Sequence, residues 1–175
     1  MISFIGRPIW ALLILVSSSF DLHANINESI EQAQLSAVGT GELTWWGIKV
    51  YDATLYAQDG SYHPDRPHAI RITYQLKFSR EQLARKSLEE IERIFGTQPD
   101  RDALFQQLQT VFRDVTPGDH ILGIHYPGQG AEFYSEDVLL GRIEDERLAA
   151  AFFSIWLDPE TREPDLRAQM LGYIQ

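Results

Sequence analysis

The sequence predicts an α+β domain in which helices pack on one face of an antiparallel sheet. Segments of alternating apolar and polar residues, typical of strands, come in two runs of three. Each run is followed by two segments that carry the apolar stripe of an amphipathic helix. Strands and helices segregated along a chain favour this architecture over the alternating pattern of a parallel sheet. No repeat or linker divides the chain, so residues 25–175 are expected to form one domain.

The first run of strands begins with a hairpin. Residues 35–44 and 48–57 are expected to be strands joined by a short turn at Trp46-Gly47. Because both faces of the second strand carry bulky side chains, we expect this strand to be covered on two sides. Residues 69–78 form the third expected strand, which has one apolar and one polar face.

Two helices are expected next. Ser79 and Gln82 form the pattern of a capping box, which predicts a helix start, and Gly96 marks the end of that helix. Thr97 and Asp100 open the second helix. The first helix carries three carboxylates, Glu89, Glu90 and Glu92. We expect these carboxylates on a solvated polar face rather than in a catalytic pair.

The second half of the chain repeats this order. Strands are expected over residues 120–126, 131–134 and 138–142, with a hairpin loop at 127–130 between the first two. Asp145 is expected to cap a third helix, and a short last helix is expected from Asp165 to about Gly172.

The N-terminus has the layout of a secretory signal peptide. Arg7 supplies a positive charge, residues 9–16 are an uninterrupted apolar run, and Ala24 offers a small residue for cleavage. The apolar run is shorter than the roughly 20 residues that a spanning helix needs, although an uncleaved anchor remains the alternative. We therefore expect a signal peptide over residues 1–24 and a periplasmic or secreted domain over 25–175. No later segment is long and apolar enough to span a membrane.

Composition excludes several functions. The chain carries a net charge of -10 and has no basic stripe, which makes nucleic acid an improbable partner. It contains no cysteine, so thiolate metal sites and disulfides are excluded. His63 and His68 flank a Pro-rich turn, a spacing that does not suit a metal site. We expect neither a metal nor a cofactor, and the sequence leaves the oligomeric state open.

The first hairpin is rich in aromatic side chains that have a polar group: Trp45, Trp46, Tyr51 and Tyr56. Such side chains suit either ordinary packing or the wall of a pocket for an amphipathic ligand. Exposed tryptophans would instead indicate a surface for a partner.

Several segments together resemble the chalcone isomerase-like family. They are residues 38–56 (VGTGELTWWGIKVYDATLY), Phe78-Ser79-Arg80, residues 116–119 (TPGD), residues 151–157 (AFFSIWL) and Leu171-Gly172. Their order covers nearly all of residues 25–175 and is most similar to the exported bacterial branch of the family. The resemblance implies an open-faced β-sandwich with a cleft between the core hairpin and the helices.

The resemblance also implies where functional groups would lie. Plant enzymes of the family cyclise chalcones without a cofactor, and non-catalytic members bind fatty acids in the same cleft. The arginine of the enzymes corresponds to Gly41 here, so the cation that would steady a phenolate is missing. The family's other polar positions fall at Tyr51, Arg80 and Ser87. A further hydroxyl is retained as Ser154, beside the apolar Ile155.

These observations favour a non-catalytic binding protein over an enzyme. The expected ligand is a small apolar or amphipathic molecule with a carboxylate, such as a fatty acid. The expected ligand-binding residues are Tyr51, Arg80, Ser87, Ser154 and Ile155. The alternative is a cofactor-independent isomerase or lyase in which Tyr51 and Ser154 handle protons. An interaction protein that uses Trp45 or Trp46 is the third hypothesis.

Overall fold

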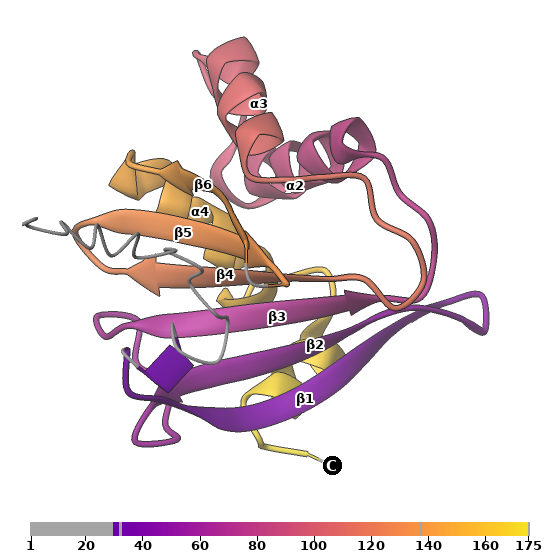
Figure 1. Cartoon of the computed structure of the whole chain (residues 1–175), viewed down its shortest axis with the longest axis vertical. Helices are drawn as coiled ribbons and strands as arrows, with labels where there is room; N and C mark the ends of the chain where they lie inside the picture. Colours follow the sequence, from indigo (N-terminus) through magenta and orange to yellow (C-terminus); the bar gives the residue numbers. More distant parts are fainter. Residues whose placement is uncertain (1–29, 32, 137, 175) are drawn as a thin grey trace, which may run out of the picture.

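Six strands form one antiparallel sheet in which each strand pairs with its neighbours in sequence, in the order β1-β2-β3-β4-β5-β6 (Figure 1). The computed structural model describes residues 30–31, 33–136 and 138–174. The predicted signal peptide therefore lies outside the described residues. The strands are β1 (Leu35–Trp45), β2 (Ile48–Gln58), β3 (His68–Tyr74), β4 (His120–Tyr126), β5 (Gly130–Ser135) and β6 (Val138–Ile143).

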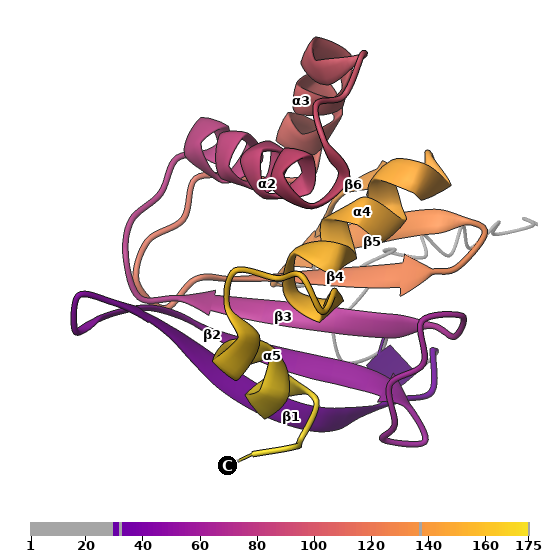
Figure 2. The same ribbon diagram turned by 180° about the vertical axis from the view of Figure 1, so that it is seen from behind.

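Four helices of the described chain complete the α+β fold. They are α2 (Arg80–Phe95), α3 (Arg101–Thr110), α4 (Glu146–Leu157) and α5 (Pro164–Met170). Figure 2 shows α4 and α5 lying across the same face of the sheet, with α2 and α3 beside α4. The predicted fold class is confirmed. The capping box of α2 is confirmed as well, because Ser79 accepts from the backbone of Gln82 and the Gln82 side chain accepts from Ser79.

The third strand is shorter than predicted. It ends at Tyr74 because the backbone groups of Tyr74 bond to Gly118 and Asp119, in the segment that leads into β4. Phe78 instead forms an isolated antiparallel bridge with Val115. The two connections that run from the sheet to α2 and back from α3 therefore lie side by side, and they hold the helices away from this end of the sheet (Figure 1).

Strand β2 is also less covered than predicted. The face that carries Ala53 and Leu55 is fully buried against the helices. Val50 and Thr54 on the opposite face are only half-buried, and Ile48 at the start of the strand is exposed. The bulky side chains on both faces of β2 therefore do not correspond to a second layer that covers this strand. A smaller apolar cluster, formed around Leu122, Ile124 and Tyr134, lies apart from the main core.

The last helix packs directly on the backbone of β1 because two positions of that strand are glycines. A methyl group built on Gly39 would overlap the carbonyl oxygen of Gln169 and lie 2.8 Å from that of Met170. One built on Gly41 would lie 2.7 Å from the Leu166 side chain. These glycines therefore allow α5 to close the sheet at its β1 edge.

Two buried histidines lie opposite each other on neighbouring strands, His68 on β3 and His125 on β4. His68 contributes Nδ1 to a 2.8 Å hydrogen bond with the Arg66 carbonyl, and Nε2 of His125 lies 3.1 Å from Glu146. Their rings meet edge to face at 4.9 Å, and His125 stacks on Phe153. Among the described residues, the second nitrogen of each ring is buried and has no hydrogen-bond partner, so each ring fits best as the neutral form. Burial lowers the pKa of His68 to about 4 and lowers that of His125 as well.

Mutation of Gly39 to Ala should destabilise the domain by about 1–3 kcal/mol, because backbone atoms of α5 must move to admit the methyl group. Ser36→Ala is the matched control, since Ser36 is an exposed residue of the same strand. Chemical denaturation of both variants measures the difference. Equal free energies of unfolding for the two variants would show that α5 does not pack tightly on β1.

The histidines should make the domain sensitive to acid. The folded-state pKa of His68, about 4, lies below its ordinary value of 6.5, so the unfolded chain takes up a proton first as the pH falls. His68 contributes about 3 kcal/mol to the free energy of unfolding. This contribution is complete above pH 6.5 and is lost as the pH falls from 6.5 to 4. Urea unfolding at several pH values should show a shallower loss for His68→Phe than for the exposed-site control His63→Phe. If the free energy of unfolding of His68→Phe falls with pH as steeply as that of His63→Phe, His68 is not the source of the acid sensitivity.

Candidate functional site

An apolar cavity of about 640 Å³ lies between the sheet and the helices. Its volume is within the range of roughly 300–1,000 Å³ that is usual for small-molecule sites. The sheet contributes apolar side chains of β1 to β5, and α2 and α4 cover them. Representative apolar residues of the wall are Leu43, Ile70, Ile72, Phe133, Phe152 and Ile155.

Three hydroxyl groups of the cavity wall have unused hydrogen-bonding capacity. Tyr51 accepts a 3.0 Å hydrogen bond from the indole of Trp156, and no acceptor for its own proton is found in the described part of the chain. Within residues 30–31, 33–136 and 138–174, the hydroxyls of Tyr74 and Ser87 form no hydrogen bond. Because these residues line the cavity, their hydroxyls are available to a polar atom of a ligand or to water.

Burial raises the pKa of Tyr51 well above its ordinary value, and it does the same for Tyr74. Glu163 and Glu90 act in the same direction on Tyr51, because a phenolate there would face two carboxylates. Both phenols therefore stay protonated at physiological pH. They can donate hydrogen bonds, but they cannot serve as general bases without a large cost.

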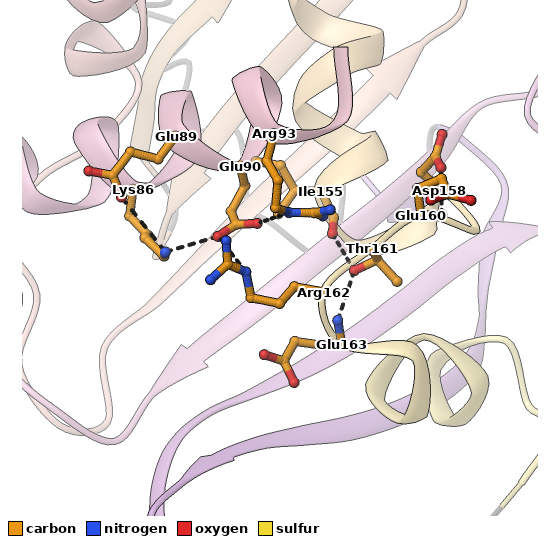
Figure 3. A network of polar contacts seen from close by, with 10 residues as sticks. All are labelled: Lys86, Glu89, Glu90, Arg93, Ile155, Asp158, Glu160, Thr161, Arg162 and Glu163. Atoms are coloured by element: carbon orange, nitrogen blue, oxygen red, sulfur yellow. Dashed lines mark hydrogen bonds and ion pairs between the residues drawn. The ribbon is translucent and has the colours of Figure 1, made fainter. Parts of the chain in front are cut away.

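A buried carboxylate with three cations borders the cavity. Glu90 of α2 is 7% exposed, and Figure 3 shows cations converging on it from two parts of the chain. Lys86 and Arg93 of the same helix lie 2.9 Å and 2.8 Å from its oxygens, and Arg162 of the segment after α4 lies at 3.3 Å. Burial alone would raise the pKa of Glu90, but the hydrogen bonds from Arg93 and Lys86 outweigh it and hold the pKa low. Lys86 also lies 3.7 Å from Glu89.

Lys86 and Arg162 line the cavity and retain donors that Glu90 does not use. Arg162 approaches Glu90 through Nε, and its two Nη groups donate no hydrogen bond to the residues that the structure describes. The Arg162 side chain is largely exposed, so these donors lie where the cavity meets solvent. Glu163 also lines this region and limits its positive charge. The site thus combines an apolar interior with guanidinium and ammonium donors at one side.

The structure brings three of the five sequence-predicted site residues to this cavity. Tyr51, Ser87 and Ile155 line it. Arg80 does not, because it lies exposed in the first turn of α2, where its backbone N–H donates to Asp114. Ser154 does not line it either, and its hydroxyl donates to the Ala150 carbonyl one turn earlier.

The ionic part of the site was not predicted from the sequence. Glu90 was expected on a solvated face, and that expectation is wrong, because α2 turns Glu90 toward the segment that follows α4. The spacing of Lys86, Glu90 and Arg93, three and four residues apart on one helix, was an available signal for ion pairs. The contribution of Arg162 had no local signal, since it depends on tertiary structure.

Other candidate sites are weaker. A hollow of about 510 Å³ near β5 and β6 includes Arg142 and Glu132, which are already paired at 2.7 Å. Across the described ranges, no group of three or more side chains is arranged to hold a metal ion. No helix in the same ranges has the length and hydropathy needed to cross a membrane.

The fold and the cavity define a class of protein: a single-sheet α+β domain that encloses an apolar cavity between its sheet and its helices. Residues 21–172 match the family described as chalcone isomerase-like, and the chain belongs to this family. The predicted membership is therefore confirmed.

Two individual proteins show similarity over most of the chain. An uncharacterized protein of Haemophilus influenzae is 28% identical over 141 residues, which cover 80% of this chain and 69% of that protein. The crystal structure of a fatty-acid binding protein of Arabidopsis thaliana superposes with a TM-score of 0.63 at 15% identity. The superposition covers 86% of this chain and 90% of that one, and it shows that the two share a fold.

The family resemblance would put the arginine of the plant enzymes at position 41 of β1, and this chain has glycine there. Gly41 faces α5, and Leu166 and Gln169 occupy the space that a side chain would need. An arginine could not extend from this position toward the cavity without displacing α5. The cations of this site come instead from α2 and from the segment after α4.

Proposed function

We propose that this protein binds a small amphipathic molecule that has an apolar chain and a carboxylate, such as a fatty acid, without chemically changing it. The observation that carries this proposal is the apolar cavity of about 640 Å³ bordered by Lys86 and Arg162. A fatty-acid binding protein with the same fold supports the same choice of ligand.

The two parts of the cavity match the two parts of such a ligand. The alkyl chain would lie among the apolar residues, where each buried methylene group contributes about 0.8 kcal/mol. The carboxylate would accept from the free Nη groups of Arg162 and from Lys86, at the exposed side of the cavity. Full burial of the charge would be costly, and this placement avoids it.

Binding fits the polar groups of the cavity better than catalysis does. The raised pKa of Tyr51 keeps its phenol protonated, so it acts as a hydrogen-bond donor rather than a base. Ser154 does not line the cavity and cannot act there with Tyr51.

Mutation of Arg162 to Gln should weaken the binding of a fluorescent undecanoic acid by about tenfold to a hundredfold, because a charge-assisted hydrogen bond is lost. The methyl ester of the same probe should bind both proteins alike. Fluorescence titration of the full chain measures both affinities. Arg147→Gln is the matched control, since Arg147 is an exposed cation of α4.

Arg80→Gln tests the sequence-based assignment in the same assay, and we expect no effect because Arg80 is absent from the cavity wall. Failure of the wild-type chain to bind the acid would refute the proposed function. An equal loss for acid and ester in Arg162→Gln would show that Arg162 does not bind the carboxylate.

We also propose that the domain is exported and acts in the periplasm or outside the cell. Arg7, the apolar run of residues 9–16 and Ala24 support this proposal. Protein purified from the envelope or medium of its own host should begin at Asn25, which intact mass and N-terminal sequencing would measure. An intact Met1 in a cytoplasmic fraction would contradict export, and an intact Met1 in the membrane fraction would indicate an uncleaved anchor.

A further inference from the structure

The hairpin that joins β1 to β2 ends in an exposed apolar group of side chains. Trp45, Trp46 and Ile48 are 71%, 87% and 58% exposed, and we call these three residues the hairpin tip. The pairing of β2 with β3 begins only at Tyr51, so the tip extends beyond the neighbouring strand (Figure 1). Two exposed tryptophans and an isoleucine at one turn form an apolar patch, and such patches mark surfaces that contact a protein or a membrane.

The backbone conformation of the turn disfavours a bulky residue at position 46, so the fold does not explain the presence of Trp46. Trp46 has a φ of 52° and Gly47 a φ of 78°, so both central residues adopt the left-handed conformation of a type I′ turn. Asparagine followed by glycine is the favoured pair in such turns, and a bulky residue with positive φ is rare. Because the Trp46 side chain is almost fully exposed, core contacts do not compensate for this strain. A strained, exposed aromatic residue is typical of a functional position.

The hairpin tip adjoins the cavity. Trp45 lines the cavity wall, and so do Thr44 before it and Val50 on the opposite strand. Ile48 is the cross-strand partner of Trp45, and Trp46 follows Trp45 in the turn, so the two exposed apolar side chains neighbour Trp45 on its solvent side. An apolar ligand that passes along this surface would reach the cavity without crossing open water.

The charge around the tip decides which surface it suits. Lys49 follows Ile48, but it is paired with Glu42 at 3.2 Å and with Asp52 at 2.6 Å. The whole chain carries a net charge of -10, which opposes attraction to an anionic surface. Tryptophan, with its apolar ring and its single N–H donor, is enriched where a bilayer meets water. A zwitterionic bilayer therefore matches the tip better than an anionic one.

We propose that the hairpin tip inserts into the interface of a zwitterionic phospholipid bilayer, so that an apolar ligand passes between the bilayer and the cavity. The transfer step rests on the proposed function, whereas insertion of the tip does not. Trp46 and Ile48 would enter the bilayer, and Trp45 would form the path from the lipid to the cavity wall.

The test uses Trp46→Asn in the full chain, with Trp10→Phe in every protein so that the N-terminal indole gives no signal. Asparagine suits this position of a type I′ turn, so the variant should keep or increase the thermal stability of the fold. With dioleoylphosphatidylcholine vesicles, the parent emission should shift to the blue, and lipids brominated on their acyl chains should quench it. Trp46→Asn should lose at least half of the quenching. Val138→Asn, at an apolar residue of β6 that is as exposed as Ile48, should lose none.

A second measurement follows the transfer of the fluorescent fatty acid from vesicles to the protein. We expect Trp46→Asn to slow transfer by about tenfold while the affinity in vesicle-free solution stays unchanged. Quenching that is absent from the parent, or equal in parent and Trp46→Asn, would overturn the proposal. Parent dimers that disappear in Trp46→Asn, without any quenching by lipid, would overturn it in favour of self-association. Quenching without fatty-acid binding in solution would support insertion and refute the proposed function alone.

Discussion

The buried carboxylate of Glu90 is the constraint on which the cavity depends. A carboxylate this deeply buried would be strongly destabilising without partners, and its cations come from α2 and from the segment after α4. The contact with Arg162 adds a link between α2 and the segment after α4 to the two ion pairs that Glu90 forms within its own helix. Lys86 and Arg93 still compensate the carboxylate when Arg162 is replaced, whereas loss of all three cations would leave an unpaired charge in the protein interior. A chain without cysteine has no disulfide to link these two parts.

Most of the fold could be predicted because its signals are local. Alternating residues identified six strands, and the capping residues Ser79 and Asp145 marked the starts of α2 and α4. The end of β3 could not be predicted, since Phe78 continues the apolar alternation of the strand. Its departure from the sheet depends on pairing with Val115, a residue distant in sequence.

The site was less predictable than the fold, for the same reason. Tyr51 and Ser87 were found through the resemblance to a family, and the structure places both at the cavity. Arg80 was chosen because the resemblance puts a polar position of the family's first helix there, but Arg80 lies exposed in the first turn of α2 and does not line the cavity. Glu90 looked like one of several solvated carboxylates, and only the folded chain shows that Arg162 reaches it.

The cavity has a consequence for the lifetime of the protein. A molecule that fills the cavity gives the side chains of the wall additional dispersion contacts. A molecule that occupies this space in the folded state, and not in the unfolded chain, stabilises the fold by about 4 kcal/mol at a thousand times its dissociation constant. Resistance to proteases would then rise and fall with the supply of the molecule. Under the proposed function, the abundance of this protein would in that way follow the concentration of the molecule that it binds, without any dedicated regulator.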